Sequence, residues 1–165
     1  MTRFLSDFKD GNSAQSVVMA LFAKCGLHNT VVDPKSQDRQ YWDIITDGHD
    51  LSFTTEVKFD KYEARSGNIA IETFNPRLGK PSGLGITKAF FWAHVLVDNV
   101  VWITPTNTLR LYVKETPAKK VIKIGGDGNA ELQLYSSEIL PVVFTRIDKI
   151  TSRKLLKYIK ECLHG

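Results

Sequence analysis

Three side chains in the first half of the chain have the types and spacing suited to phosphodiester hydrolysis: Asp43, Glu56 and Lys58. They lie in two β-prone runs, residues 42–46 and 51–59, whose turn-rich connection predicts an antiparallel hairpin. Because side chains alternate along a strand, Glu56 and Lys58 share a face, and the hairpin can bring Asp43 beside them. Carboxylate oxygens bind hard cations such as Mg²⁺ or Mn²⁺, and a lysine can orient or help deprotonate the attacking water.

A solvated strand face with a cross-strand ion pair would give the same residues, and an isolated D…E-x-K pattern more often has that origin. Two features favour a reactive site here. The strand around Glu56 and Lys58 is otherwise apolar or hydroxyl-bearing, and a further acid, Glu72, ends the next short strand at residues 69–71. We therefore expect Glu72 to join Asp43, Glu56 and Lys58 as a catalytic residue.

The ordered series of motifs resembles the PD-(D/E)XK nuclease superfamily, and most closely its small phage and bacterial endonucleases and its Holliday-junction-resolvase-like members. The likeness covers roughly residues 10–104, and the matching segments after an initial helix are 41–45, 55–58, 67–72, 80–84 and 87–89. It implies an α/β, restriction-endonuclease-like core in which helices flank a central mixed β-sheet. It also implies an endodeoxyribonuclease that depends on Mg²⁺, with Mn²⁺ able to substitute, and possible homodimer formation.

The resemblance assigns roles residue by residue. Asp43 and Glu56 would bind the metal, the backbone carbonyl of Val57 would complete its coordination, and Lys58 would serve the nucleophilic water. Many members carry a further glutamate on the first helix, where this chain has Gln15, whose neutral amide oxygen can still bind a metal. The missing negative charge leaves two alternatives open. The protein is either an active enzyme that binds one metal ion or two, or a catalytically weak or inactive nucleic-acid-binding protein that retains the nuclease fold.

A glycine-rich loop after the proposed site strand carries Lys80, Ser82 and Lys88, which could clamp a phosphate backbone. An ordinary polar loop is an equally good interpretation. The net charge of +4 and the pI of about 9.0 are compatible with DNA as a partner, although many proteins that never bind nucleic acid have similar values.

The other elements must hold this site in place. A helix capped by Asn12 or Ser13 is expected to end near Gly26, and residues 29–40 read as a loop. Further elements are expected in this order: a helical turn at 87–89, a hairpin of 91–97 and 100–104, a helix at 105–114, strands at 120–124 and 130–134 around a glycine-rich turn at 125–128, and a helix at 152–163.

Length and composition predict one globular domain spanning residues 1–165, with 42% hydrophobic and 24% charged residues. The chain lacks a run of roughly 20 apolar residues and the apolar stretch of a signal peptide. We therefore expect a cytoplasmic protein, or one in the host-cell cytoplasm if a phage encodes it. Cys25 and Cys162 are isolated, which predicts neither a zinc site nor a disulfide.

Overall fold

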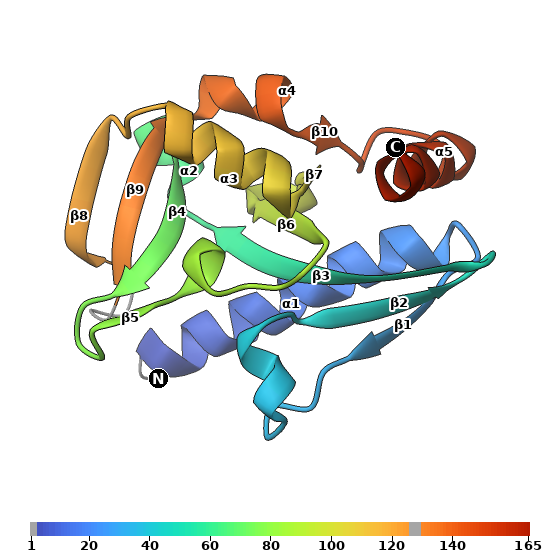
Figure 1. Ribbon diagram of the computed structural model, residues 1–165, viewed down its shortest axis with the longest axis horizontal. Coiled ribbons are helices and arrows are strands. Elements are labelled where there is room, and N and C mark those ends of the chain that lie inside the picture. The colour runs from blue at the N-terminus through green and yellow to red at the C-terminus, as the bar shows by residue number, and fades with distance from the viewer. Residues whose placement is uncertain (1–2, 126–129) are drawn as a thin grey trace.

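A central six-stranded mixed sheet and an adjacent four-stranded sheet organise the described part of the chain (Figure 1). The computed structural model describes residues 3–125 and 130–165. The central sheet has the order β1 (His28–Val31), β2 (Ile44–Gly48), β3 (Leu51–Asp60), β6 (Phe91–Leu96), β7 (Val101–Pro105) and β10 (Thr145–Arg146). The second sheet has the order β5 (Lys80–Pro81), β4 (Asn68–Asn75), β9 (Ala130–Ser136) and β8 (Lys120–Gly125).

Strand directions confirm the expected mixed sheet. The β2–β3 and β6–β7 pairs are antiparallel hairpins, as predicted, whereas β3 and β6 run parallel with Glu56 opposite Trp92. The β6–β7 turn places Asp98 and Asn99 at φ 62° and 59°, the left-handed backbone that a tight hairpin requires. The second sheet is antiparallel throughout and was not anticipated, because its central pair joins β4 to β9, two strands far apart in sequence.

Helices cover both faces of the central sheet. They are α1 (Arg3–Ala23), α2 (Glu63–Ser66), α3 (Thr106–Glu115), α4 (Leu140–Val143) and α5 (Ser152–His164), with short 3-10 turns η1 (Gln37–Gln40), η2 (Gly83–Gly85), η3 (Val97–Asn99) and η4 (Ser137–Ile139). Within the described ranges, no helix combines the length and apolar character needed to cross a membrane.

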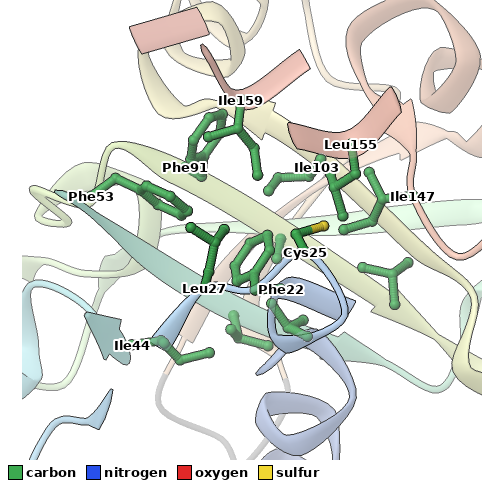
Figure 2. Close-up of a cluster of buried hydrophobic side chains, with 14 of the residues drawn as sticks. Phe22, Cys25, Leu27, Ile44, Phe53, Phe91, Ile103, Ile147, Leu155 and Ile159 are labelled. Atoms are coloured by element: carbon green, nitrogen blue, oxygen red, sulfur yellow. The ribbon is translucent and has the colours of Figure 1, made fainter. Parts of the chain in front are cut away.

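One hydrophobic core lies between the central sheet and the pair α1 and α5 (Figure 2). Phe53 makes edge-to-face contacts with Phe22 of α1 and Phe91 of β6, with ring centroids 5.4 Å and 5.3 Å apart. Leu155 and Ile159 of α5 complete this layer and are nearly inaccessible to solvent. A second core on the opposite face joins β6 to α3, α4 and the second sheet. Every residue of β6 is therefore buried, which explains why its sequence is apolar apart from His94.

Several expected boundaries were wrong. Helix α1 begins at Arg3, so Asn12 and Ser13 lie inside it rather than capping it. These residue types cap a helix only where the preceding backbone is not helical. Residues 29–40, expected as a loop, contain most of the edge strand β1 and all of η1; the polar sequence reflects how exposed β1 is. The helical turn expected at 87–89 is absent from that described segment, and the nearest short helix is η2.

The helices expected at 105–114 and 152–163 are confirmed as α3 and α5, and the strands expected at 120–124 and 130–134 as β8 and β9. Most of the glycine-rich turn between β8 and β9, residues 126–129, lies outside the described residues.

Candidate active site

The β2–β3 register places Asp43 opposite Glu56. Ile44 pairs with Thr55, and the Asp43 amide just before β2 donates to the Thr55 carbonyl at 3.0 Å. Val57 packs in the core under α1 and α5, so its neighbours Glu56 and Lys58 point to the other face, towards the second sheet. Asp43 and Glu56 are each only 7% exposed. The hairpin thus brings the two predicted metal-binding carboxylates together in a buried position.

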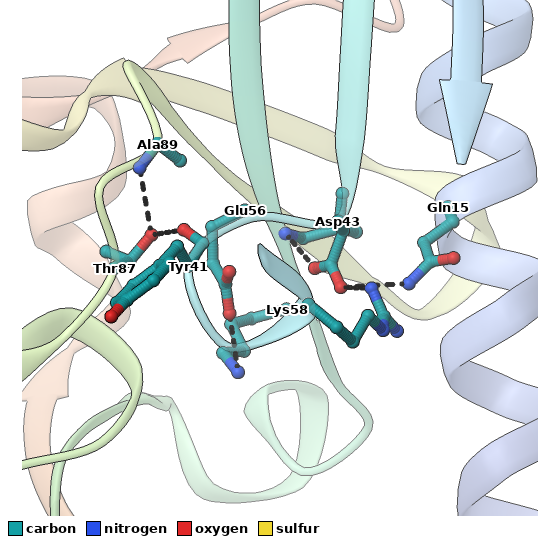
Figure 3. A network of polar contacts seen from close by, with 9 residues as sticks. Gln15, Tyr41, Asp43, Glu56, Lys58, Thr87 and Ala89 are labelled. Carbon is teal, nitrogen blue, oxygen red and sulfur yellow. Dashed lines mark hydrogen bonds and ion pairs between the residues drawn. The ribbon is translucent and has the colours of Figure 1, made fainter. Parts of the chain in front are cut away.

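The Asp43 carboxylate is held on both oxygens (Figure 3). Its Oδ2 accepts a hydrogen bond from the Val57 backbone amide at 2.7 Å. Its Oδ1 accepts one from Gln15 Nε2 at 3.2 Å and forms an ion pair with the guanidinium of Arg39. The first helix therefore does deliver Gln15 to the site. In this orientation the amide nitrogen faces Asp43 and the amide oxygen points away from it.

Arg39 was not identified from the sequence. It lies in η1, within the segment read as a loop, four residues before Asp43. No sequence signal identified it, because η1 ends at Gln40 and Asp43 lies beyond the turn. Its guanidinium supplies a positive charge directly at the carboxylate that the resemblance assigns to a metal.

Lys58 forms an ion pair with Glu56, with Nζ 2.9 Å from Oε1. Burial alone would lower the pKa of Lys58, but the negative charges of Glu56, Glu72 and Asp43 outweigh it and hold this pKa above its ordinary value. A lysine with a raised pKa stays protonated at neutral pH. Of the two roles expected for Lys58, this environment favours orienting the water and stabilising negative charge over accepting a proton.

The pKa of Glu56 is also subject to opposing effects. Burial raises its pKa, and the nearby Asp43 charge raises it further, against the lowering effect of Lys58. The net pKa lies above that of an ordinary glutamate. A buried carboxylate of this kind gains from a second cation beside it, because the added positive charge favours the ionised form.

Glu72 approaches the site from the second sheet rather than from a strand next to β3. It is partly buried on β4, and its charge acts on Lys58. The η2 turn packs directly on this part of β4. A Cβ atom added to Gly83 would lie 2.6 Å from the Glu72 carbonyl oxygen, and Gly83 has φ +50°. Glycine at this position therefore permits the close approach of the loop to the strand that carries Glu72.

Asp60, at the end of β3, ties the site strand to the second sheet. Its Oδ1 accepts from the backbone amides of Tyr62 and Glu63 at 2.9 Å and 3.2 Å, and its Oδ2 accepts from Ala70 of β4 at 3.0 Å. The fully buried His94 places Nε2 3.4 Å from Oδ2. Burial alone would raise the pKa of Asp60, but His94 and these amides hold it below its ordinary value.

The donor set suits a hard divalent cation. Val57 directs its amide towards Asp43, and in a strand the carbonyl of a residue leaves on the same side as its amide. The available oxygen ligands are the carboxylates of Asp43 and Glu56 and the backbone carbonyl of Val57. The amide oxygen of Gln15 would join them if the side-chain amide rotated by 180°. Among the described residues, no group of three or more His, Cys, Asp or Glu side chains could hold a metal ion. A cation such as Mg²⁺, which usually keeps several waters and binds through one or two carboxylates, fits such a set.

The loop predicted to bind nucleic acid is held by many contacts. The Lys88 ammonium lies 3.7 Å from the ring centroid of Tyr41, and its backbone amide donates to the Tyr41 carbonyl at 3.1 Å. Lys80 and Lys88 are both exposed. Ser82 instead turns its hydroxyl inward, with no hydrogen-bond partner among the described residues, so in this conformation it does not face a ligand.

Arg110 of α3 binds the backbone of this loop, a role that was not predicted from the sequence. Its guanidinium donates to the carbonyl of Leu84 at 3.3 Å and to the carbonyl of Thr87. Thr87 in turn donates its hydroxyl to the Tyr41 carbonyl at 2.6 Å. These contacts connect α3, through the loop, to the segment that leads into Asp43.

Comparison with known proteins gives a likeness of fold. No model of a known protein family matches the chain, and no curated protein sequence matches it. Among solved structures, a bacterial homing endonuclease is similar with a TM-score of 0.51 and 15% identity, over 65% of this chain and 74% of that one. Hjc, a Holliday junction resolvase from the archaeal hyperthermophile Archaeoglobus fulgidus, matches with a TM-score of 0.48 and 11% identity, over 84% of this chain and 93% of that one. The match to the homing endonuclease and the central mixed sheet flanked by helices show that the chain has the expected restriction-endonuclease-like fold.

Proposed function

We propose that this protein is a metal-dependent endonuclease that hydrolyses DNA phosphodiester bonds, with Mg²⁺ as its cofactor and Mn²⁺ able to substitute. One observation carries the proposal: two buried carboxylates, Asp43 just before β2 and Glu56 of β3, lie opposite each other, and Lys58 is paired to Glu56. Burying two like charges side by side is unfavourable, and such arrangements are concentrated at active sites. A fold shared with a homing endonuclease supports the same conclusion.

Each residue has a role in this proposal. A metal bound by Asp43, Glu56 and the Val57 carbonyl would polarise the phosphate and lower the pKa of a bound water. Protonated Lys58 would orient the attacking water and stabilise charge on the phosphate. Glu72 would help to keep Lys58 protonated, because its negative charge raises the pKa of that lysine.

DNA would be bound mainly through its phosphates. Lys80 of β5 and Lys88 of the segment after η2 are exposed, and their charges can pair with a sugar-phosphate backbone. The sequence contains no recognisable base-reading module, which favours structure-directed substrates such as four-way junctions. A twofold homodimer would supply two sites for cutting both strands, and the molar mass in solution, measured by light scattering, tests it.

The decisive experiment compares variants on plasmid, linear duplex, single-stranded and four-way-junction DNA, each with Mg²⁺, Mn²⁺ or EDTA. Glu56→Ala and Lys58→Ala should abolish metal-dependent cleavage. Lys157 and Glu161, a Lys–Glu pair on the exposed side of α5 with Nζ and Oε1 3.6 Å apart, provide the matched control, and Lys157→Ala and Glu161→Ala should cleave like wild type. Equal cleavage by wild type and Glu56→Ala would show that the site is wrong.

A second candidate rests on Gln15. Where a further acid would help to hold metal, Gln15 instead donates a hydrogen bond to Asp43. This favours a weakly active or inactive protein that binds nucleic acid. DNA binding by wild type without cleavage of any of the four substrates, in either metal, would support this alternative and contradict the nuclease proposal.

A further inference from the structure

Arg39 occupies a carboxylate oxygen of Asp43 that a metal ion could bind. A carboxylate oxygen accepts about two hydrogen bonds, and Asp43 Oδ1 already has two partners, Gln15 and Arg39. Asp43 Oδ2 accepts one hydrogen bond, from the Val57 amide, so a cation could bind there, but the nearby guanidinium of Arg39 would repel it. A cation can therefore bind Oδ1 only if one of these partners leaves. Gln15 sits on α1 and is 6% exposed, whereas the Arg39 side chain is 30% exposed, so Arg39 is the partner that can move.

The local backbone allows that movement. None of the four described residues of η1 is buried, so the turn carries no side chain anchored in either core. The neighbouring residues Asp38 and Gln40 are exposed. Rotation of the Arg39 side chain towards solvent thus costs the ion pair and little packing.

The charges around the site fit a single divalent ion. Among the described residues, Asp43, Glu56 and Glu72 contribute three negative charges, and Lys58 and Arg39 contribute two positive charges. With Arg39 in place the group carries one net negative charge. With Arg39 displaced it carries two, which one Mg²⁺ balances. A second divalent ion would leave an excess of positive charge, because Gln15 brings none of the negative charge of an acid.

We propose that Arg39 and one divalent cation occupy Asp43 in turn, and that the displaced guanidinium then binds a phosphate of the DNA. The inference rests on the metal-dependent function proposed above. A planar guanidinium forms two parallel hydrogen bonds equally well with a carboxylate and with a phosphate, so the same group can serve both states. Arg39 is thereby a metal-responsive phosphate-binding residue.

The first half of the test measures Mn²⁺ binding by calorimetry in the absence of DNA. Arg39→Gln should bind Mn²⁺ roughly two- to fivefold more tightly than wild type, because a partly exposed ion pair no longer competes. Arg153→Gln, at an exposed position of α5, is the control and should match wild type. Suppose that wild type binds Mn²⁺, that Glu56→Ala does not, and that Arg39→Gln binds it no more tightly than wild type. This result would overturn the inference about Arg39 and leave the proposed function standing. No Mn²⁺ binding by any of these proteins would overturn the proposed function as well.

The second half measures the affinity for a labelled 20-base-pair duplex by fluorescence anisotropy, in Ca²⁺ or in EDTA, over a range of salt concentrations. With Ca²⁺, Arg39→Gln should bind more weakly, and the slope of log affinity against log salt should fall in magnitude by about one phosphate contact. In EDTA its slope should equal that of wild type, because Asp43 then holds the arginine. A loss of slope of the same size in both conditions would refute metal-dependent release, and no loss in either would refute the phosphate contact.

Discussion

Replacing Asp60 with asparagine tests whether the site strand and the second sheet are joined as described. Asp60 is buried, and its two oxygens accept hydrogen bonds from amides on both sides of the junction: Tyr62 and Glu63 on one oxygen, Ala70 on the other. Asparagine has nearly the same shape but offers one acceptor and one donor. In either orientation its NH₂ group faces at least one of these backbone N–H donors.

The magnitude follows from these contacts. One buried amide loses its partner, which costs about 1–3 kcal/mol. The hydrogen bonds that remain go to a neutral oxygen rather than a charged one, which weakens them by about 1 kcal/mol in total. His94 also loses its carboxylate partner. Asp60→Asn should therefore lower the free energy of unfolding by about 2–4 kcal/mol at pH 7, and lower the melting temperature by roughly 5–15 °C.

The effect should depend on pH in a definite direction. The pKa of Asp60 in the folded protein lies below its ordinary value of 3.8. The charged form therefore stabilises the fold, and this stabilisation is fully present above the unfolded pKa and lost as the pH falls through the folded pKa. The difference between wild type and Asp60→Asn should be constant from neutral pH down to about pH 5 and shrink below about pH 4.

Urea unfolding followed by tryptophan fluorescence provides the measurement, at several pH values. Asp47, an exposed residue of β2, supplies the control, and Asp47→Asn should unfold within about 0.5 kcal/mol of wild type. The reasoning is refuted if Asp60→Asn has the wild-type urea midpoint at pH 7, or if its deficit grows as the pH falls.

Three further changes test the site more locally. Gln15→Glu adds a carboxylate beside Asp43, so calorimetry should show tighter Mn²⁺ binding; unchanged affinity would return Gln15 to an ordinary helix position. Gly83→Ala should lower the free energy of unfolding, measured by thermal unfolding, by about 1–3 kcal/mol, because its Cβ would lie 2.6 Å from the backbone of β4. Gly79→Ala is the control: this glycine has φ +62° but no atom within 4 Å of an added Cβ, so the loss should be only about 1 kcal/mol. Arg110→Ala should raise amide hydrogen exchange across residues 84–88 and lower DNA cleavage while leaving Mn²⁺ affinity unchanged; wild-type exchange rates in that loop would contradict this.

Local pattern was enough to predict the parts of the site that lie close in sequence. Glu56 and Lys58 are two residues apart on one strand, and the tight turn before them sets the β2–β3 register that brings Asp43 opposite Glu56. Alternation and turn chemistry act over a few residues, so a single sequence reveals them. The β6–β7 hairpin was found for the same reason.

The rest of the site depends on contacts between distant segments. The position of Glu72 is set by the pairing of β4 with β9, where Ile71 lies opposite Gln133, and no local pattern encodes that partner. Arg39 could not be placed because η1 is a short turn of polar residues that look like any loop. The inward turn of the Ser82 hydroxyl follows from the packing of the η2 segment on β4, which is equally invisible in the sequence.

The separation between β4 and β9 also bears on how the chain folds. The β2–β3 hairpin can form as soon as residue 60 has been synthesised, but β4 has no β9 beside it until residue 136 has been added. Pairings between distant segments form slowly, and an unpaired strand edge invites association with other chains. A nascent or truncated chain that stops before residue 130 would carry Asp43, Glu56 and Lys58, but β4 would lack its partner strand β9, and its core would lack the buried residues that follow residue 130. Such fragments are expected to aggregate, so the proposed activity would arise only after the later strands have joined the sheet.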